Sequence, residues 1–231
     1  MPVGSRIYMK RNMPPKEIIE GFKKIPTANI ADCMGRLYAM SSRIRLMTAP
    51  SEANMVGVAL TVKAPPGDNL LIHQSLNMIQ AGDVLIIGNG FAQSQSLLGE
   101  VAAAYAKFKK AAGIVLDGPV RDVQAMYNMG IPVYATGSTP GGPYKEGPGE
   151  INVPIACGNI SINPGDIIVG DSDGVIVIPL NDAVRVLEDA KEFTNKDREK
   201  VLNAYKGTLD RTWVEKAIDE KGFEIIDDVF K

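Results

Sequence analysis

Two carboxylates and a guanidinium lie at a spacing that one helix-strand unit can bring together. Glu100 follows Gly99 at the predicted start of a helix, and Arg121-Asp122 come shortly after the apolar run 113–116. Twenty residues separate Glu100 from Arg121, enough for one helix, a turn and a strand. The helix start and the strand end would then lie side by side, at the edge where α/β sites gather. Such a point suits a small anionic substrate held by a divalent metal ion.

The predicted helix start is suited to binding a carboxylate group. The first N–H groups of a helix lack intrahelical partners and carry partial positive charge, so an anion is favoured there. The donors would be the backbone amides of Val101 and Ala102, and Gly99 would allow a ligand to approach closely. The alternative is that Glu100 is only a favourable acidic residue in a first helical turn.

Arg121 and Asp122 could supply the remaining groups of a metal and substrate site. Arginine grips an oxygen or carboxylate by a forked contact better than lysine does. Asp122 is a hard oxygen ligand suited to Mg²⁺ or Mn²⁺, and Mg²⁺ often takes one or two carboxylates and keeps several waters. The alternative is an ion pair with surface residues, but the position just after a strand favours a site.

Other candidate residues are better explained by structure than by chemistry. His73 is the only histidine, which excludes a site built on several histidines, and it could line a site or be a packed structural residue. Gly88-Asn89-Gly90 lacks the third glycine of a dinucleotide-binding motif and does not open a helix. The segment 171–174 (Asp-Ser-Asp-Gly) lacks the glutamate of a calcium loop, so a turn is expected.

Charged residues between Lys191 and Lys200 are expected to form the solvated face of a long helix. In a multimer, however, an acid of this helix could reach the site of a neighbouring subunit. The candidates are Glu192, Asp197 and Glu199.

Composition is that of an ordinary globular protein. The chain has 231 residues, of which 45% are hydrophobic and 23% charged. A net charge of −2 gives no reason to expect nucleic-acid binding. No apolar run is long enough to span a membrane, and no apolar segment follows the first residues, so we expect neither a membrane span nor a signal peptide. Cys33 and Cys157 lie far apart, which favours two free thiols in a cytoplasmic protein.

The pattern of apolar residues predicts the elements that must position the site. Thr27 is expected to be the N-cap of the second helix and Asp68 to cap the third. Helices are expected at 16–20, 27–34, 68–80, 100–110, 122–129 and 181–205, with a last helix from about 210. Strands are expected at 55–63, 84–87, 113–116, 132–134, 151–155, 159–162, 167–169 and 175–178. The alternation of helix and strand predicts an α/β core with partly parallel pairing.

The second half of the chain differs in character. A long glycine- and proline-rich loop is expected at 137–149, and loops of this length are usually functional or interfacial. Short strands and hairpin turns follow and predict a β-rich second layer. We expect one compact domain, with a core at about 27–180 and a helical C-terminal arm at about 181–231.

The motif from Gly99 through 118–122 (Gly-Pro-Val-Arg-Asp), with 170–175 (Gly-Asp-Ser-Asp-Gly-Val) downstream, resembles a known family. It is similar to the class II pyruvate aldolases that act on 4-hydroxy-4-methyl-2-oxoglutarate or 4-carboxy-4-hydroxy-2-oxoadipate. These share a family with the regulator of ribonuclease activity A. The likeness covers roughly 27–179, and its acid-x20-Arg-Asp spacing is met by Glu100, Arg121 and Asp122. The family continues with two residues and an acid, where this chain has Ala125.

The resemblance implies a swivelling β/β/α-type core and assembly as a homotrimer or homohexamer with sites between subunits. It also implies that Asp122 binds the metal and that Arg121 holds the keto oxygen of pyruvate. The segment Gly99, Glu100, Val101 and Ala102 would receive the pyruvate carboxylate.

Both the residues and the resemblance favour metal-dependent retro-aldol cleavage of a 4-hydroxy-2-oxo acid. Glu100 would orient a water that takes the 4-hydroxyl proton, and the same chemistry predicts decarboxylation of oxaloacetate. The competing hypothesis is a non-enzymatic binding protein like the ribonuclease regulators, which need not keep the metal aspartate. A methyltransferase is disfavoured because no glycine-rich cofactor loop of that kind is present.

Overall fold

The computed structural model describes residues 2–51 and 53–230. The chain divides into two compact units, 1–192 and 193–231, and the division falls within the long helix α6, Ala183–Tyr205. The first unit contains the sheet and every predicted site residue before that helix. No helix in the described residues is long and apolar enough to cross a membrane.

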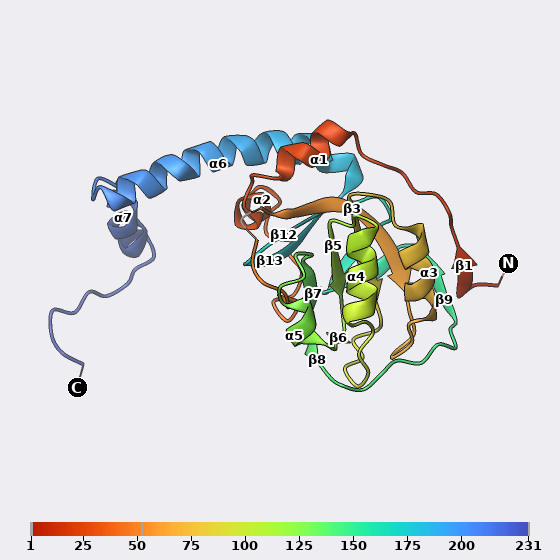
Figure 1. The fold of residues 1–231 in the computed structure, drawn as a ribbon. Coiled ribbons are helices and arrows are strands. Elements are labelled where there is room, and N and C mark those ends of the chain that lie inside the picture. The colour runs from red at the N-terminus through yellow and green to blue at the C-terminus, as the bar shows by residue number, and fades with distance from the viewer. Residues whose placement is uncertain (1, 52, 231) are drawn as a thin grey trace. The chain divides into compact units, whose positions relative to one another are not determined.

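The elements of the first unit are mostly short strands (Figure 1). The strands are β1 Ser5–Ile7, β2 Arg45–Leu46, β3 Met55–Lys63, β4 Asp83–Gly88, β5 Gly113–Leu116, β6 Pro119–Val120, β7 Val133–Ala135, β8 Gly137–Ser138, β9 Gly149–Ile151, β10 Ile155–Cys157, β11 Ile160–Ile162, β12 Ile167–Asp171 and β13 Gly174–Ile178. The helices are α1 Lys16–Phe22, α2 Thr27–Cys33, α3 Leu70–Met78, α4 Glu100–Phe108, α5 Val123–Met126, the 3₁₀ turn η1 Leu180–Asp182 and α6 Ala183–Tyr205.

The main sheet is mixed, with a parallel centre. Its path runs β1-β9-β3-β4-β5-β7-β2, and β12 and β13 extend from β3. Strands β3, β4, β5 and β7 pair in parallel. Strand β2 pairs antiparallel with β7, β12 pairs antiparallel with β3 and β13, and β9 pairs antiparallel with β3 but parallel with β1. The central strands β3 and β4 are mostly apolar, and every residue except Lys63 is buried because both faces of the sheet are covered. The predicted α/β core with partly parallel pairing is confirmed.

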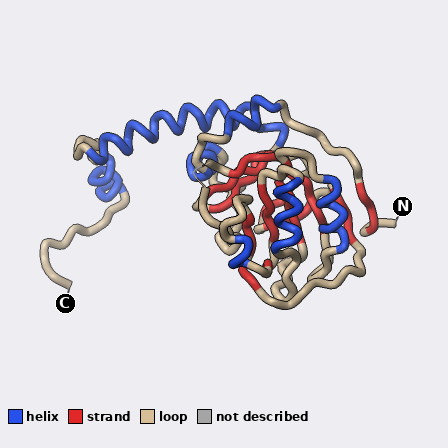
Figure 2. Tube along the Cα trace, in the orientation of Figure 1, coloured by secondary structure: helices blue, strands red, loops and turns tan. Residues whose placement is uncertain are grey.

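Different layers cover the two faces of this sheet (Figure 2). Leu85 and Ile87 of β4 pack with α3, α4 and α5, whereas Val84 and Ile86 pack with the β10–β11 hairpin and β13. This division follows from the alternation of side chains along a strand. A third apolar cluster joins α1, α2 and the start of α6 to the β12–β13 hairpin. The carboxyl ends of the parallel strands therefore meet at one edge, between a helical layer and a β layer.

The start of α2 differs from the prediction. Pro26 flanks the helix and Thr27 is already its first residue, so the prediction of Thr27 as N-cap is wrong. Asp171 does the capping instead, because its carboxylate accepts the Thr27 N–H at 2.9 Å and the Thr27 hydroxyl at 2.7 Å. The turn expected at 171–174 is confirmed, since Asp171 pairs with Gly174 across the β12–β13 hairpin.

The strand expected at 151–155 is wrong. Its two ends belong to different strands, because β9 ends at Ile151 and β10 begins at Ile155. Asn152 between them has a φ of +56°, a left-handed conformation that does not continue a strand. Strand β9 pairs with β3, whereas β10 pairs with β11 in a separate hairpin.

The second unit contains the rest of α6 and the helix α7, Thr212–Glu220. Asp210 caps α7, since one carboxylate oxygen accepts the Thr212 N–H at 2.9 Å and its hydroxyl at 2.7 Å. Large apolar side chains of this unit are exposed, among them Trp213, Phe223 and Phe230. The predicted C-terminal helices are confirmed.

Candidate active site

Arg121 and Asp122 form a tight turn between β6 and α5. Strand β6 pairs in parallel with β8, so the chain between β5 and Arg121 is partly a strand. Asp122 then adopts a left-handed conformation with a φ of +58°, which aspartate tolerates better than most residues. The Arg121 N–H donates to the Leu98 carbonyl at 3.0 Å, which ties the turn to the segment before α4.

The Asp122 side chain lies against the start of α4. Its Oδ2 accepts the Glu100 N–H at 3.1 Å and lies 3.6 Å from Arg121 Nε. Gly99 makes this approach possible, because a Cβ there would overlap Asp122 Oδ2 and Arg121 Cγ. The predicted meeting of helix start and strand end is therefore present, with Asp122 as the carboxylate at the helix terminus.

A pocket of about 320 Å³ opens beside this turn, and the predicted residues Gly99, Val101, Ala102, Arg121 and Asp122 line it. The first helical hydrogen bond is made by the Ala103 N–H to the Gly99 carbonyl at 3.1 Å. The Val101 and Ala102 amides therefore have no helical partners.

Glu100 contacts the Asp122 carboxylate through its backbone. Its N–H binds Asp122, whereas its side chain is exposed and the residue is not among those lining the pocket. The role of the Glu100 carboxylate in orienting a water remains a prediction.

The opposite wall of the pocket is formed by Asn69, His73 and Lys145. Burial, and then the positive charge of Lys145, lower the pKa of His73 below its usual 6.5. At neutral pH the imidazole is therefore uncharged, and Lys145 carries the positive charge of this wall. Asn69 Nδ2 donates to the Leu97 carbonyl at 3.0 Å, while its buried Oδ1 has no partner among the described residues.

Sequence reasoning left His73 open and missed Asn69 and Lys145. Lys145 lies in the long loop 137–149, whose length was the available signal. No signal in the sequence pointed to Asn69, because a polar residue before a helix is ordinarily only a cap.

The donor set of the turn fits one hard cation. The side chain of Asp122 is 43% exposed, and within the described part of the chain its contacts with Glu100 and Arg121 are made by Oδ2. Among all the residues that the structure describes, no three histidine, cysteine or acidic side chains form a cluster that could hold a metal ion. A single carboxylate with water is a set that Mg²⁺ accepts, whereas a structural zinc site needs four protein ligands.

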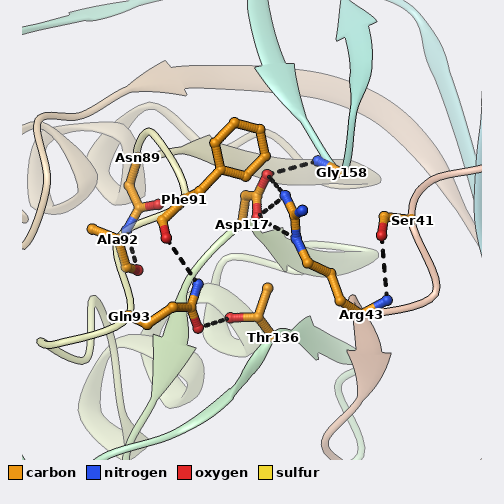
Figure 3. Close-up of polar contacts among 9 residues, drawn as sticks. All are labelled: Ser41, Arg43, Asn89, Phe91, Ala92, Gln93, Asp117, Thr136 and Gly158. Carbon is orange, nitrogen blue, oxygen red and sulfur yellow. Dashed lines mark hydrogen bonds and ion pairs between the residues drawn. The ribbon is translucent and has the colours of Figure 1, made fainter.

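A second aspartate on the same segment is engaged in a different way (Figure 3). Asp117, at the end of β5, is 1% exposed and accepts two forked hydrogen bonds of 2.8 Å from Arg43 Nη2 and one of 2.9 Å from the Gly158 N–H. The Arg43 guanidinium also lies 4.3 Å from the centre of the Phe91 ring. This cluster fixes the segment that leads to Arg121, and sequence reasoning missed it.

The other predicted candidates lie away from this pocket or in the second unit. Gly88 ends β4 as expected, and Gly90 has a left-handed φ of +68°. Asp197 and Glu199 belong to the second unit and Glu192 ends the first, so their contribution to a neighbouring site remains a prediction.

Known proteins show similarity along most of the chain. A family model described as RraA-like, Aldolase/RraA, matches residues 27–177. A relative from Halalkalibacterium halodurans is named "Putative 4-hydroxy-4-methyl-2-oxoglutarate aldolase". It is 36% identical over 189 residues, which cover 81% of this chain and 89% of that protein.

Solved structures show the same fold. Streptomyces coelicolor RraAS2, described as an unusual member of the RNase ES inhibitor RraA family, has a TM-score of 0.74 at 26% identity, covering 82% of this chain and 98% of that one. A Geobacillus kaustophilus protein named as an S-adenosylmethionine: 2-dimethylmenaquinone methyltransferase has a TM-score of 0.61 at 27% identity, covering 67% and 95%. The family model and the relative agree over the α/β core, and the chain belongs to the RraA-like Aldolase/RraA family.

Proposed function

We propose that this protein is a divalent-metal-dependent lyase that cleaves a 4-hydroxy-2-oxo acid and releases pyruvate. The observation that carries the proposal is the position of Asp122. A half-exposed carboxylate lies at a helix N-terminus, next to a guanidinium and two free amides, on the wall of a pocket. The name of the Halalkalibacterium relative supports the same reaction class.

The pocket offers one place for each part of a 2-oxo acid. The amides of Val101 and Ala102 would receive the carboxylate, since the helix terminus favours negative charge. Arg121 would donate to the 2-oxo oxygen. Asp122 would hold Mg²⁺ or Mn²⁺, which when bound supplies a Lewis acid that polarises the 2-oxo group.

The chain's own residues would then carry the charge and the proton through the reaction. As the C3–C4 bond breaks, its electron pair moves toward C3 and the 2-oxo oxygen, and Arg121 stabilises the negative charge that develops there. The 4-hydroxyl loses its proton to a water that Glu100 orients, and the 4-carbon becomes a carbonyl. The same water returns a proton to C3, which gives pyruvate.

The opposite wall favours substrates with a second negative group. Lys145 supplies a positive charge there, and the neutral His73 supplies a ring N–H that can donate to a carboxylate. A 4-hydroxy-2-oxo dicarboxylate such as 4-hydroxy-4-methyl-2-oxoglutarate has such a group. Oxaloacetate has one too, and its decarboxylation develops the same charge at the 2-oxo oxygen.

A non-enzymatic binding role is the second candidate, because RraAS2 is described as belonging to a ribonuclease inhibitor family. The presence of Asp122 beside an open pocket favours the enzyme. We further propose assembly as a homotrimer or a homohexamer, on the family likeness alone.

The direct test is pyruvate release from 4-hydroxy-4-methyl-2-oxoglutarate and from oxaloacetate, with Mg²⁺ and then with excess EDTA. We expect metal-dependent release that is lost in Asp122→Ala and kept in Asp173→Ala, an exposed aspartate outside this pocket. Absence of pyruvate from both compounds with wild-type protein would contradict the proposal and favour the binding role.

A further inference from the structure

Part of the pocket wall belongs to an irregular loop that a buried carboxylate holds in place. Gly142, Pro143 and Lys145 line the pocket, and residues 139–148, between β8 and β9, belong to no helix or strand. Asp68 is 4% exposed, and its Oδ2 accepts the Glu146 N–H at 2.6 Å and the Gly147 N–H at 3.0 Å. These two amides come directly after Lys145.

The same carboxylate also binds the other element of this wall. Oδ1 of Asp68 accepts the Leu70 N–H at 2.9 Å, at the start of α3, and α3 carries His73. Asp68 is not the flanking residue of the helix, which is Asn69, but it still satisfies one of the first amides. One buried side chain therefore joins the loop of Lys145 to the helix of His73.

Backbone hydrogen bonds also join the loop to the segment before α3, and they do so at Tyr144, the residue before Lys145. The Asn69 N–H donates to the Tyr144 carbonyl at 2.9 Å, and the Tyr144 N–H donates to the Gly67 carbonyl at 2.8 Å. Ser96 fixes the loop further upstream, since its N–H and hydroxyl donate to the Gly141 carbonyl at 2.9 and 2.6 Å. Lys145 therefore lies between two anchors, the Tyr144 backbone on one side and the Asp68 carboxylate on the other.

We infer that Asp68 is a positioning residue that holds Lys145 on the same wall of the pocket as His73, and so sets the affinity of the pocket for a second carboxylate on the substrate. This inference rests on the proposed function. Three amides bind one buried carboxylate, and an unpaired buried donor is costly. Asparagine has the same shape but offers its NH₂ group where one of the oxygens accepts. Asp68→Asn should therefore release the loop while leaving Arg121 and Asp122 in place.

The first measurement is hydrogen exchange at the Glu146 and Gly147 amides. In wild-type protein we expect both amides to exchange far more slowly than in an unstructured chain, although both residues are on the surface. Asp68→Asn should speed their exchange by roughly tenfold or more, the effect of losing one charge-assisted hydrogen bond. The wild-type arm needs no variant, so fast exchange of both amides there would overturn the inference even if Asp68→Asn failed to fold.

The second measurement compares two substrates that differ in the second carboxylate. For 4-hydroxy-4-methyl-2-oxoglutarate, Asp68→Asn should raise KM by roughly tenfold, as Lys145→Met should, and the double variant should add little. For the monocarboxylate 4-hydroxy-2-oxopentanoate, the KM of Asp68→Asn should stay within about twofold of the wild-type value. An equal rise for both substrates, or additive effects in the double variant, would overturn the inference.

The matched control is Asp166→Asn. Asp166 is also buried, at 3% exposure, and accepts backbone amides from Asn163 at 2.8 Å and Leu180 at 3.0 Å. It lies at the start of β12, away from the pocket, so its variant should lower stability without changing either KM. If wild-type protein releases no pyruvate, the proposed function fails, and the exchange rates still decide whether Asp68 holds the loop.

Discussion

Asp117 follows strand β5 and Asp122 comes shortly after the next strand, β6, yet their surroundings are opposite. Asp117 is 1% exposed, and Arg43 and the Gly158 N–H bind its two oxygens. Asp122 is 43% exposed and accepts one backbone N–H at Oδ2. A carboxylate whose hydrogen bonds are all made within the chain holds structure, whereas one with an oxygen facing a pocket can bind a ligand. The comparison separates an aspartate that holds the structure from the one that we propose as the metal ligand.

The largest effect is expected on turnover, when Arg121 beside the exposed Asp122 is replaced. Replacing Arg121 by alanine should lower kcat for pyruvate release by about 10²- to 10³-fold, or roughly 3 kcal/mol, because one donor to the developing oxyanion is lost. The thermal midpoint should change little, since the side chain is 47% exposed. Arg36→Ala, at an exposed arginine outside the pocket, is the control. Unchanged turnover of Arg121→Ala would contradict the assignment.

Replacing the buried Asp117 should instead lower the stability of the protein. Asp117→Asn removes the charge that pairs with Arg43, and we expect the free energy of unfolding in urea to fall by about 2 kcal/mol. This is below the usual cost of breaking a buried pair, because Arg43 is itself 37% exposed. Asp122→Asn should change the same quantity by less than about 0.5 kcal/mol. Equal losses in the two variants would remove the distinction between the two aspartates.

A smaller effect is expected at Gly99, where the start of α4 meets the turn of Arg121 and Asp122. Gly99→Ala places a methyl group against Asp122 Oδ2 and Arg121 Cγ, so the turn must move away from the start of α4. We expect kcat to fall roughly tenfold, the scale of a displaced catalytic group. Steady-state kinetics measure the change, and circular dichroism checks that the fold is kept. Full activity would mean that the Asp122 contact with α4 is not needed.

The smallest effect concerns charge in the pocket. His73 is the only histidine, so its ring protons give a single NMR titration curve. We expect a midpoint below 6.5, because burial and Lys145 lower its pKa. The folded state then binds fewer protons than the unfolded state, so stability from this group is complete above pH 6.5 and declines as pH falls through the folded pKa.

Lys145→Met should raise that midpoint, but not to 6.5, because burial is the larger cause and persists. A midpoint that does not move would show that Lys145 is not close enough to His73 to act on it.

The parts of the site that sequence reasoning found are those joined by local chain. Glu100, Arg121 and Asp122 lie on one helix-strand unit, so spacing alone brings α4 and the turn together. The strands and helices of the core were found because their apolar periodicity is long and regular. The unpredicted strands β1, β2, β6 and β8 are two or three residues each and depend on pairing with other segments of the chain.

The parts that sequence reasoning missed are set by tertiary contacts. Arg43 is 74 residues from Asp117, and nothing in either segment points to the other. Lys145 reaches the pocket because Asp68, 78 residues before Glu146, anchors its loop. Thr27 was mistaken for an N-cap because the acceptor, Asp171, is 144 residues away. Side chains that bind backbone groups of distant segments carry no local signal.

The most direct test of the account is Mn²⁺ binding followed by electron paramagnetic resonance, with oxalate present as a stable 2-oxo acid analogue. Wild-type protein and Asp173→Asn should each bind Mn²⁺, and the signal of the free ion should fall as protein is added. Asp122→Asn should bind far more weakly while keeping its stability. Equal Mn²⁺ binding by Asp122→Asn and wild-type protein would contradict the claim that the half-exposed carboxylate of Asp122 holds the metal.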